Sequence, residues 1–144
     1  MPADTDTDPA RPARRATLPL VYACSGCSSA AQLANHLAVR LDREGRAEMS
    51  CIAGVGGDVP ALVKVAVGAA ARQRPVLVID GCPQSCARQA LARHGVAPSH
   101  HLALWEAGVR KRQHEDFDPS QAAHLMSQCQ ALLDALQRGP AHGS

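Results

Sequence analysis

One stretch constrains the fold more than any other, because it joins an apolar run to a turn that carries two cysteines. Residues 76–79 are consecutive apolar side chains, mostly β-branched, and the polar pair Asp80-Gly81 ends the run. This pattern is typical of a buried strand followed by a turn. Cys82 and Cys86 come next, at the start of a segment with helical periodicity. The stretch therefore predicts a strand–turn–helix unit with two thiols near the positive end of a helix dipole.

The rest of the chain repeats this alternation of apolar runs and helical patterns. Strands are expected at residues 18–23, 47–52, 76–80 and 102–105. Helices are expected at residues 30–43, 59–71, 85–94 and 119–136. Strands separated by helices indicate a parallel sheet with right-handed crossovers. We therefore expect an α/β fold: a single three-layer α/β/α domain with a small parallel sheet of about four strands, similar to half of a Rossmann or flavodoxin fold.

Length and composition are consistent with one such domain, which we expect to cover residues 18–138. A chain of 144 residues can bury a substantial core. Hydrophobic residues make up 46% of the chain but aromatic residues only 2%, so the core must consist of Leu, Val, Ala and Ile. Residues 1–17 are polar and aperiodic and are predicted to form a disordered tail. Residues 139–144 are predicted to form a flexible C-terminal tail.

Charge and hydropathy argue against several kinds of partner. The net charge is +2 with both signs mixed, so nothing indicates a nucleic-acid or anionic membrane surface. No apolar run reaches the roughly 18 residues of a membrane span, and the N-terminal segment lacks the apolar core of a signal peptide. Six cysteines in such a chain favour metal binding or thiol chemistry over structural disulfides. The expected compartment is the cytoplasm.

The cysteines are concentrated at the ends of the predicted strands. Five of the six lie at or just past such an end: Cys24, Cys27, Cys51, Cys82 and Cys86. In an open parallel sheet the carboxyl ends of the strands meet at one edge, where ligands bind. We therefore expect these thiols to gather at that edge. The sixth, Cys129, lies among leucines of the last predicted helix and is expected to be a buried, small apolar side chain.

The cysteine motifs resemble those of a known family. The segments that carry the resemblance are residues 24–29, 51–57, 78–87 and, less specifically, 108–111. In this order they are similar to the motifs of the DGC-domain family, and the similarity spans residues 19–133. Proteins of that family are described as zinc-binding, a property ascribed to four cysteines. The resemblance implies a zinc site without a known reaction, and the corresponding residues here are Cys24, Cys27, Cys82 and Cys86.

The residues themselves are also consistent with a thiolate metal site. Two closely spaced cysteine pairs brought together by the fold are common in Cys₄ zinc sites. Because the two pairs are far apart in the sequence, the metal would join two strand–helix units and stabilise the domain. Four thiolates suit an iron–sulfur cluster as well as zinc. The resemblance makes Zn²⁺ the expected cofactor, with an iron–sulfur cluster as the alternative, and Cys51 is a candidate additional thiol.

Thiol chemistry is the second interpretation that the sequence leaves open. A Cys-x-x-Cys after a strand and before a helix, as at Cys24 and Cys27, is also the position of a thioredoxin-like motif. Thiols at helix starts are reactive. The chain would then be a redox or sulfur-transfer enzyme that uses Cys24, Cys27 or Cys82, with Cys51 as the resolving thiol. The sequence does not decide whether the chain is an enzyme.

Two residues before Cys82 are expected to support the cysteines. Asp80 is predicted to accept hydrogen bonds from backbone donors in the turn and so to orient Cys82, as a partner of a metal ligand does. Its simpler interpretation is a turn residue that ends a strand. Gly81 is predicted to be a turn residue that needs unusual backbone angles.

Two loops are expected to reach the same edge of the sheet. Residues 53–58 are predicted to form a flexible loop, in which Gly54, Gly56 and Gly57 would let the backbone approach a ligand closely. The spacing matches no nucleotide-binding motif, so a plain connection is the simpler interpretation. Lys111 follows the fourth predicted strand, where its charge would offset that of the thiolates or belong to a solvated loop.

Overall fold

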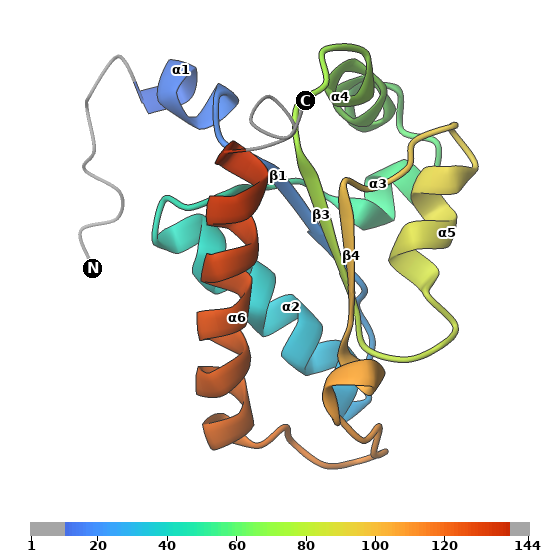
Figure 1. The fold of residues 1–144 in the computed structure, drawn as a ribbon. Helices are drawn as coiled ribbons and strands as arrows, with labels where there is room; N and C mark the ends of the chain where they lie inside the picture. The colour runs from blue at the N-terminus through green and yellow to red at the C-terminus, as the bar shows by residue number, and fades with distance from the viewer. Residues whose placement is uncertain (1–10, 139–144) are drawn as a thin grey trace, which may run out of the picture.

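The structure is a computed structural model that describes residues 11–138, in which a parallel sheet lies between two layers of helices (Figure 1). The strands are β1 (Leu20–Ala23), β2 (Glu48–Met49), β3 (Val76–Asp80) and β4 (His100–Ala103). Their order is β2-β1-β3-β4, and every neighbouring pair is parallel. The expected three-layer α/β/α fold with a four-stranded parallel sheet is confirmed.

The helices form the two outer layers. They are α1 (Arg11–Ala16), α2 (Ser29–Arg43), α3 (Ile52–Gly56), α4 (Pro60–Ala71), α5 (Cys86–Ala92), the 3₁₀ helix η1 (Leu104–Ala107) and α6 (Pro119–Arg138). Helices α2 and α6 pack together on one face of the sheet, and α3 contacts both α4 and α5 on the other face (Figure 1). The carboxyl ends of the strands and the N-terminal ends of α2, α5 and α6 therefore lie at the same end of the molecule.

The apolar pattern of the sequence explains the two layers that position the site. Every residue of β1 and β3 is buried, as expected for central strands that are covered on both faces. Leu33, Leu37 and Leu41 form the fully buried stripe of α2. This helix begins where the hydroxyl of Ser28 accepts a hydrogen bond from the Ala31 N–H at 3.1 Å.

Two elements differ from the sequence-based expectation near the sheet edge. Residues 53–58 were expected to be a flexible loop, but residues 52–56 form α3. The helix forms because the Cys51 sulfur accepts a hydrogen bond from the Gly54 N–H and caps its first turn. The fourth strand begins two residues earlier than expected and ends at residue 103, since residues 104–107 turn into η1.

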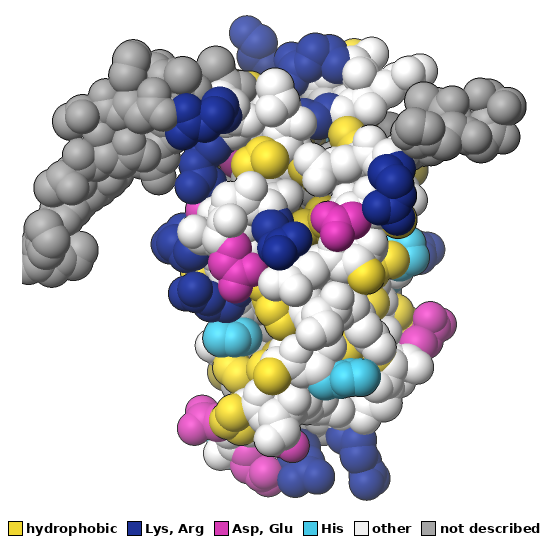
Figure 2. All heavy atoms as spheres, turned by 60° about the vertical axis from the view of Figure 1, so that its left-hand side comes forward, with side chains coloured by type: hydrophobic (Ala, Val, Ile, Leu, Met, Phe, Trp, Pro, Cys, Tyr) yellow, Lys and Arg dark blue, Asp and Glu magenta, His cyan; other side chains and the backbone are white. Residues whose placement is uncertain are grey.

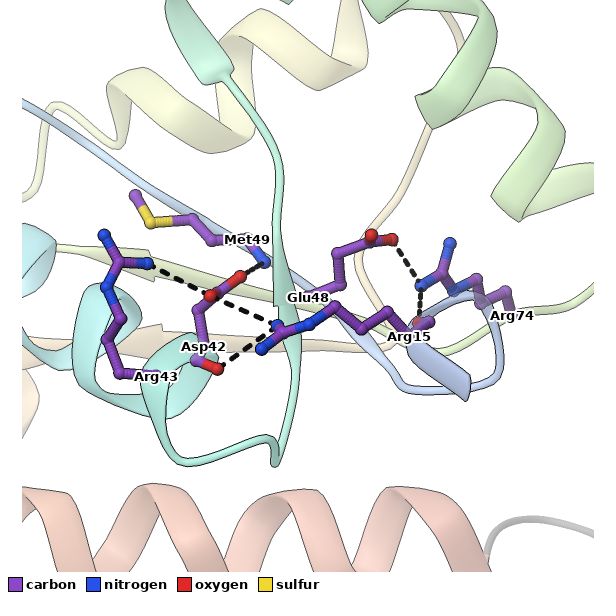
Figure 3. Close-up of polar contacts among 6 residues, drawn as sticks. All are labelled: Arg15, Asp42, Arg43, Glu48, Met49 and Arg74. Atoms are coloured by element: carbon purple, nitrogen blue, oxygen red, sulfur yellow. Dashed lines mark hydrogen bonds and ion pairs between the residues drawn. The ribbon is translucent and has the colours of Figure 1, made fainter. Parts of the chain in front are cut away.

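The prediction of a disordered tail over residues 1–17 is also wrong in part, because Arg11–Ala16 form α1. The Arg15 guanidinium donates to the Asp42 carboxylate at the end of α2, at 3.2 Å. The Arg15 carbonyl accepts a hydrogen bond from Arg74 at 2.8 Å, and Arg74 also pairs with Glu48 at 2.9 Å (Figure 3). These contacts hold α1 against the sheet. The predictions for residues 1–10 and 139–144 lie outside the described residues.

The surface and the helices carry two further observations. On the face drawn in Figure 2, Lys and Arg side chains lie among acidic and apolar ones, so charges of both signs are interspersed there. Within residues 11–138, every helix is too short or too polar to span a membrane.

Candidate metal and thiol site

The pairing of β1 with β3 brings the two cysteine motifs together. Ala23 pairs with Ile79 at the carboxyl ends of these neighbouring strands. Cys24 directly follows β1, and its backbone N–H donates to the Ile79 carbonyl at 3.1 Å. In return, the Gly81 N–H donates to the Cys24 sulfur at 3.2 Å. The first and third strand–helix loops therefore meet at the sulfur of Cys24.

Residue 81 must be glycine because a side chain would not fit at this position. A Cβ atom on it would lie 2.6 Å from the carbonyl carbon and oxygen of Ala30 and 2.9 Å from the Ala31 nitrogen, at the start of α2. The sequence indicated a glycine turn with unusual backbone angles. Among the described glycines, however, a positive φ occurs at Gly45, Gly95 and Gly108, whereas at Gly81 the constraint is the nearby backbone of α2.

Cys24 differs from the other thiols of this edge because it is buried. Burial is the main cause that raises the pKa of Cys24 to about 11; the nearby charges of Asp80, Cys82 and Cys86 act in the same direction, and the hydrogen bond from the Gly81 N–H opposes them. At neutral pH this side chain is therefore a neutral thiol. A cation that binds there must displace a proton, which couples binding to pH.

The other three cysteines of the two motifs lie at the surface of the same edge. Cys27 is exposed, and its sulfur lies 3.9 Å from the Gln113 side-chain oxygen. Cys82 is partly exposed, and its sulfur lies 3.7 Å from the Lys111 ammonium. Cys86 is the first residue of α5 and is exposed. All three belong to the loops that lead into α2 and α5, where helix dipoles and Lys111 attract negative charge.

The side chains of these cysteines are not assembled into a metal shell. In residues 11–138, no three His, Cys, Asp or Glu side chains are grouped closely enough to hold a metal ion. The six cysteines are free thiols. Thiol sulfurs are donors that suit Zn²⁺. Cys82 and Cys86 are close enough to Cys24 to affect its pKa. Tetrahedral coordination nevertheless requires the exposed side chains to rotate toward the buried one.

Asp80 fixes the turn that carries two of the cysteines. Its carboxylate is fully buried and accepts hydrogen bonds from the N–H groups of Ala87 at 2.9 Å and Arg88 at 3.2 Å. It also receives one from Nε2 of His101 at 2.8 Å. Asp80 thus ties the end of β3 to the first turn of α5 and to β4, which fixes both ends of the turn that carries Cys82 and Cys86.

His101 is the supporting residue that sequence reasoning missed. The sequence did not single out His101, because its partner depends on the pairing of β4 with β3. Its Nδ1 lies 3.4 Å from the Arg88 guanidinium, which is only a donor. The hydrogen of this imidazole is therefore on Nε2, where it donates to Asp80.

Cys51 and the glycines after it belong to α3 and its caps, where Gly54 is buried and Cys51, Gly56 and Gly57 are exposed. The Cys51 sulfur is 3.4 Å from the Gly54 nitrogen that it caps. A Cβ on Gly54 would overlap the Leu62 side chain of α4, so this glycine permits helix packing. Gly56 and Gly57 belong to the end of α3 and its C-cap. These residues therefore form a short helix with its caps and not the expected flexible loop.

Comparisons with known proteins agree with the motifs. The model of the DGC domain matches residues 20–129. The chain is 57% identical over 116 residues to the "Anaerobic and virulence modulator AnvM" of Pseudomonas aeruginosa, an alignment that covers 81% of this chain and 86% of that protein. No solved structure matches the chain. By the family model and by this similarity, the chain belongs to the DGC-domain family.

Proposed function

We propose that this chain is a regulatory protein that binds one Zn²⁺ ion at the carboxyl edge of its sheet. The proposed ligands are Cys24, Cys27, Cys82 and Cys86. The observation that carries the proposal is the hydrogen bond of 3.2 Å from the Gly81 N–H to the Cys24 sulfur, which joins the two motifs. The regulatory role is suggested by the name of the relative from Pseudomonas aeruginosa, which is called a modulator.

The residues around the thiols support a closed, structural site. When bound, Zn²⁺ would supply a cross-link between the two loops and no reaction. The Gly81 N–H would stabilise negative charge on the Cys24 sulfur. The Lys111 ammonium would partly offset the charge of four thiolates. Asp80 would hold the Cys82–Cys86 turn in place through the backbone of α5.

The test is metal content and affinity in protein purified without oxygen and without an affinity metal. We expect one zinc per chain and a loss of affinity of about 100-fold or more for each Cys→Ser variant of the four proposed ligands. Cys129→Ser is the matched control, because this thiol is buried in α6 away from the edge. Iron with sulfide would identify an iron–sulfur cluster. Protein without metal would contradict both the zinc site and the cluster.

A second candidate, thiol redox or sulfur transfer, is favoured by one contact. The Lys111 ammonium lies 3.7 Å from the Cys82 sulfur, an arrangement that attracts negative charge to a partly exposed nucleophile. In metal-free protein, iodoacetamide should then alkylate Cys82 faster than Cys27 or Cys51. Lys111→Gln should remove the difference. Equal, slow alkylation of all exposed thiols would contradict this candidate.

A further inference from the structure

The edge of the sheet that carries Cys24, Cys27, Cys82 and Cys86 is here called the thiol edge. The segment of residues 110–113, here called the strap, lies between this edge and a cavity. It has no regular secondary structure and runs past the start of α2. Lys111 and Gln113 contact the sulfurs of the two cysteines described above. Arg110 and Arg112 line a cavity on the other side. The strap therefore touches both the cysteines and the cavity.

The strap is fixed to the buried residue Ser29 at the first turn of α2. The Ser29 N–H donates to the Arg112 carbonyl at 2.9 Å. The Ser29 hydroxyl accepts from the Arg112 N–H at 2.9 Å and lies 3.5 Å from the Arg110 carbonyl, to which it donates. Ser29 lies two positions after Cys27. The backbone that forms the wall of the cavity is therefore anchored to the loop that carries a proposed ligand.

The cavity has the size and character of a site for a small polar molecule. Its volume is about 300 Å³, room for roughly ten water-sized groups. The strap forms one wall, and the start of α6 with the preceding loop forms the other. Besides the two arginines, the lining includes Asp116, Phe117, Asp118 and Gln121, together with Ser29, Gly108 and Val109.

Two of the charged groups in the wall are already engaged within the protein. The Arg112 guanidinium pairs with Glu115 at 3.4 Å. The Asp118 carboxylate accepts a hydrogen bond from the Ser120 N–H at 2.8 Å, at the start of α6. Neither group is free to neutralise a ligand fully.

Three groups of the wall remain available. Within the part of the chain that the structure describes, the Arg110 guanidinium, the Asp116 carboxylate and the Gln121 amide make no hydrogen bond or ion pair. The cavity thus offers one free cation, one free anion and one amide, with the Phe117 ring beside them. A simple anion would be repelled by Asp116, and a simple cation by Arg110.

We propose that this cavity binds a small zwitterion of the α-amino-acid class and that its occupancy is coupled through the strap to the thiol edge. The ligand carboxylate pairs with Arg110, and its ammonium group pairs with Asp116. The side chain lies against Phe117, and Gln121 completes the hydrogen bonds. A ligand that holds Arg110 acts on the strap, which Ser29 anchors, and thereby on the position of Lys111, which contacts the Cys82 sulfur. The coupling rests on the proposed function, whereas the binding does not.

The binding is tested on the full chain by calorimetry with the protein-forming L-amino acids, one at a time, and with acetate and methylamine as half-ligands. At least one amino acid should bind with a Kd of about 1 mM or tighter. Acetate and methylamine should each bind at least about tenfold more weakly. Arg110→Gln and Asp116→Asn should each weaken amino-acid binding by about tenfold or more.

The matched control is Arg72→Gln, which changes an exposed arginine at the end of α4. It should bind the amino acid as the wild type does. The binding proposal is overturned if no amino acid binds, if acetate binds equally well, or if both cavity variants bind like the wild type.

The coupling is tested by the alkylation rate of Cys82 in metal-free protein with and without the bound amino acid. We expect the rate to change by about fivefold, and Lys111→Gln should retain binding but lose this change. An unchanged rate in wild-type protein overturns the coupling. Because this measurement needs no zinc, its failure is distinct from failure of the zinc site, which the metal content reports.

Discussion

Single residues decide whether the two cysteine motifs can meet. The Gly81 N–H reaches the Cys24 sulfur only because no side chain separates the β3–α5 turn from the backbone of Ala30. Asp80 then fixes the other side of this turn by accepting from the first turn of α5 and from His101. The meeting of the two cysteine motifs thus depends on a glycine at residue 81 and on the buried carboxylate of Asp80.

Gly81→Ala should disrupt this contact. The added methyl group would lie 2.6 Å from backbone atoms of Ala30, which cannot move without shifting α2. Urea unfolding should show a loss of about 3 kcal/mol or more. The control is Gly26→Ala, whose Cβ would meet only the Ala31 methyl at an ordinary 3.6 Å. Equal stability of the two variants would contradict the close approach.

Asp80→Asn should destabilise the fold although its shape is unchanged. An amide keeps one oxygen acceptor and replaces the other by an NH₂ group, so the N–H donor of Ala87 or of Arg88 loses its partner. We expect a loss on the order of 2–3 kcal/mol in urea unfolding. Asp116→Asn, at an exposed residue, should change stability little. If both variants unfold alike, Asp80 does not hold the turn.

At the scale of elements, the sequence predicted the strands and helices that have an apolar periodicity and missed two short helices that depend on tertiary contacts. The buried strands and α2 followed from their apolar patterns, as did the common edge of the cysteines. Helix α3 did not, because two glycines lower its intrinsic propensity and its stability comes from the Cys51 cap and the Gly54–Leu62 contact. Helix α1 was missed because its anchors, Asp42 and Arg74, are distant in the sequence.

Arg74 should therefore matter for α1. Its side chain is only 9% exposed and donates to the carbonyls of Leu18 and Arg15 as well as to Glu48. Arg74→Gln should lower the free energy of unfolding by about 2–4 kcal/mol and speed hydrogen exchange in α1. Arg72→Gln, which changes an exposed arginine nearby, is the control. Unchanged exchange in α1 would show that Arg74 does not anchor it.

At the scale of the whole molecule, the strand order brings the motifs together. The sequence predicted that all carboxyl ends share one edge, but not that β1 and β3 are neighbours, because strand order depends on crossovers that leave no local pattern. It also could not give the partner of His101 or the two-sided strap, since both depend on long-range register and packing.

The buried thiols should make the metal-free protein less stable at alkaline pH. Burial raises the pKa of Cys24 to about 11 and that of Cys129 to about 12, from 9.0. Between pH 9 and these values the unfolded thiols lose protons that the folded ones keep, so the free energy of unfolding falls as pH rises. The loss should be on the order of a few kcal/mol by the upper end of this range.

The comparison variant is Cys129→Ala, measured by urea unfolding at a series of pH values. It is less stable than wild type near neutral pH because the buried sulfur is lost, but its stability should fall less steeply above pH 9. Equal slopes in the two proteins would show that Cys129 does not contribute to the pH dependence.

The most direct test of the central claim is X-ray absorption at the zinc edge of the purified full chain. Four sulfur ligands at about 2.3 Å from the metal are predicted, with one sulfur lost in Cys24→Ser and in Cys82→Ser and none in Cys129→Ser. A shell made mainly of nitrogen or oxygen at about 2.0–2.1 Å, unchanged in the ligand variants, would contradict the account.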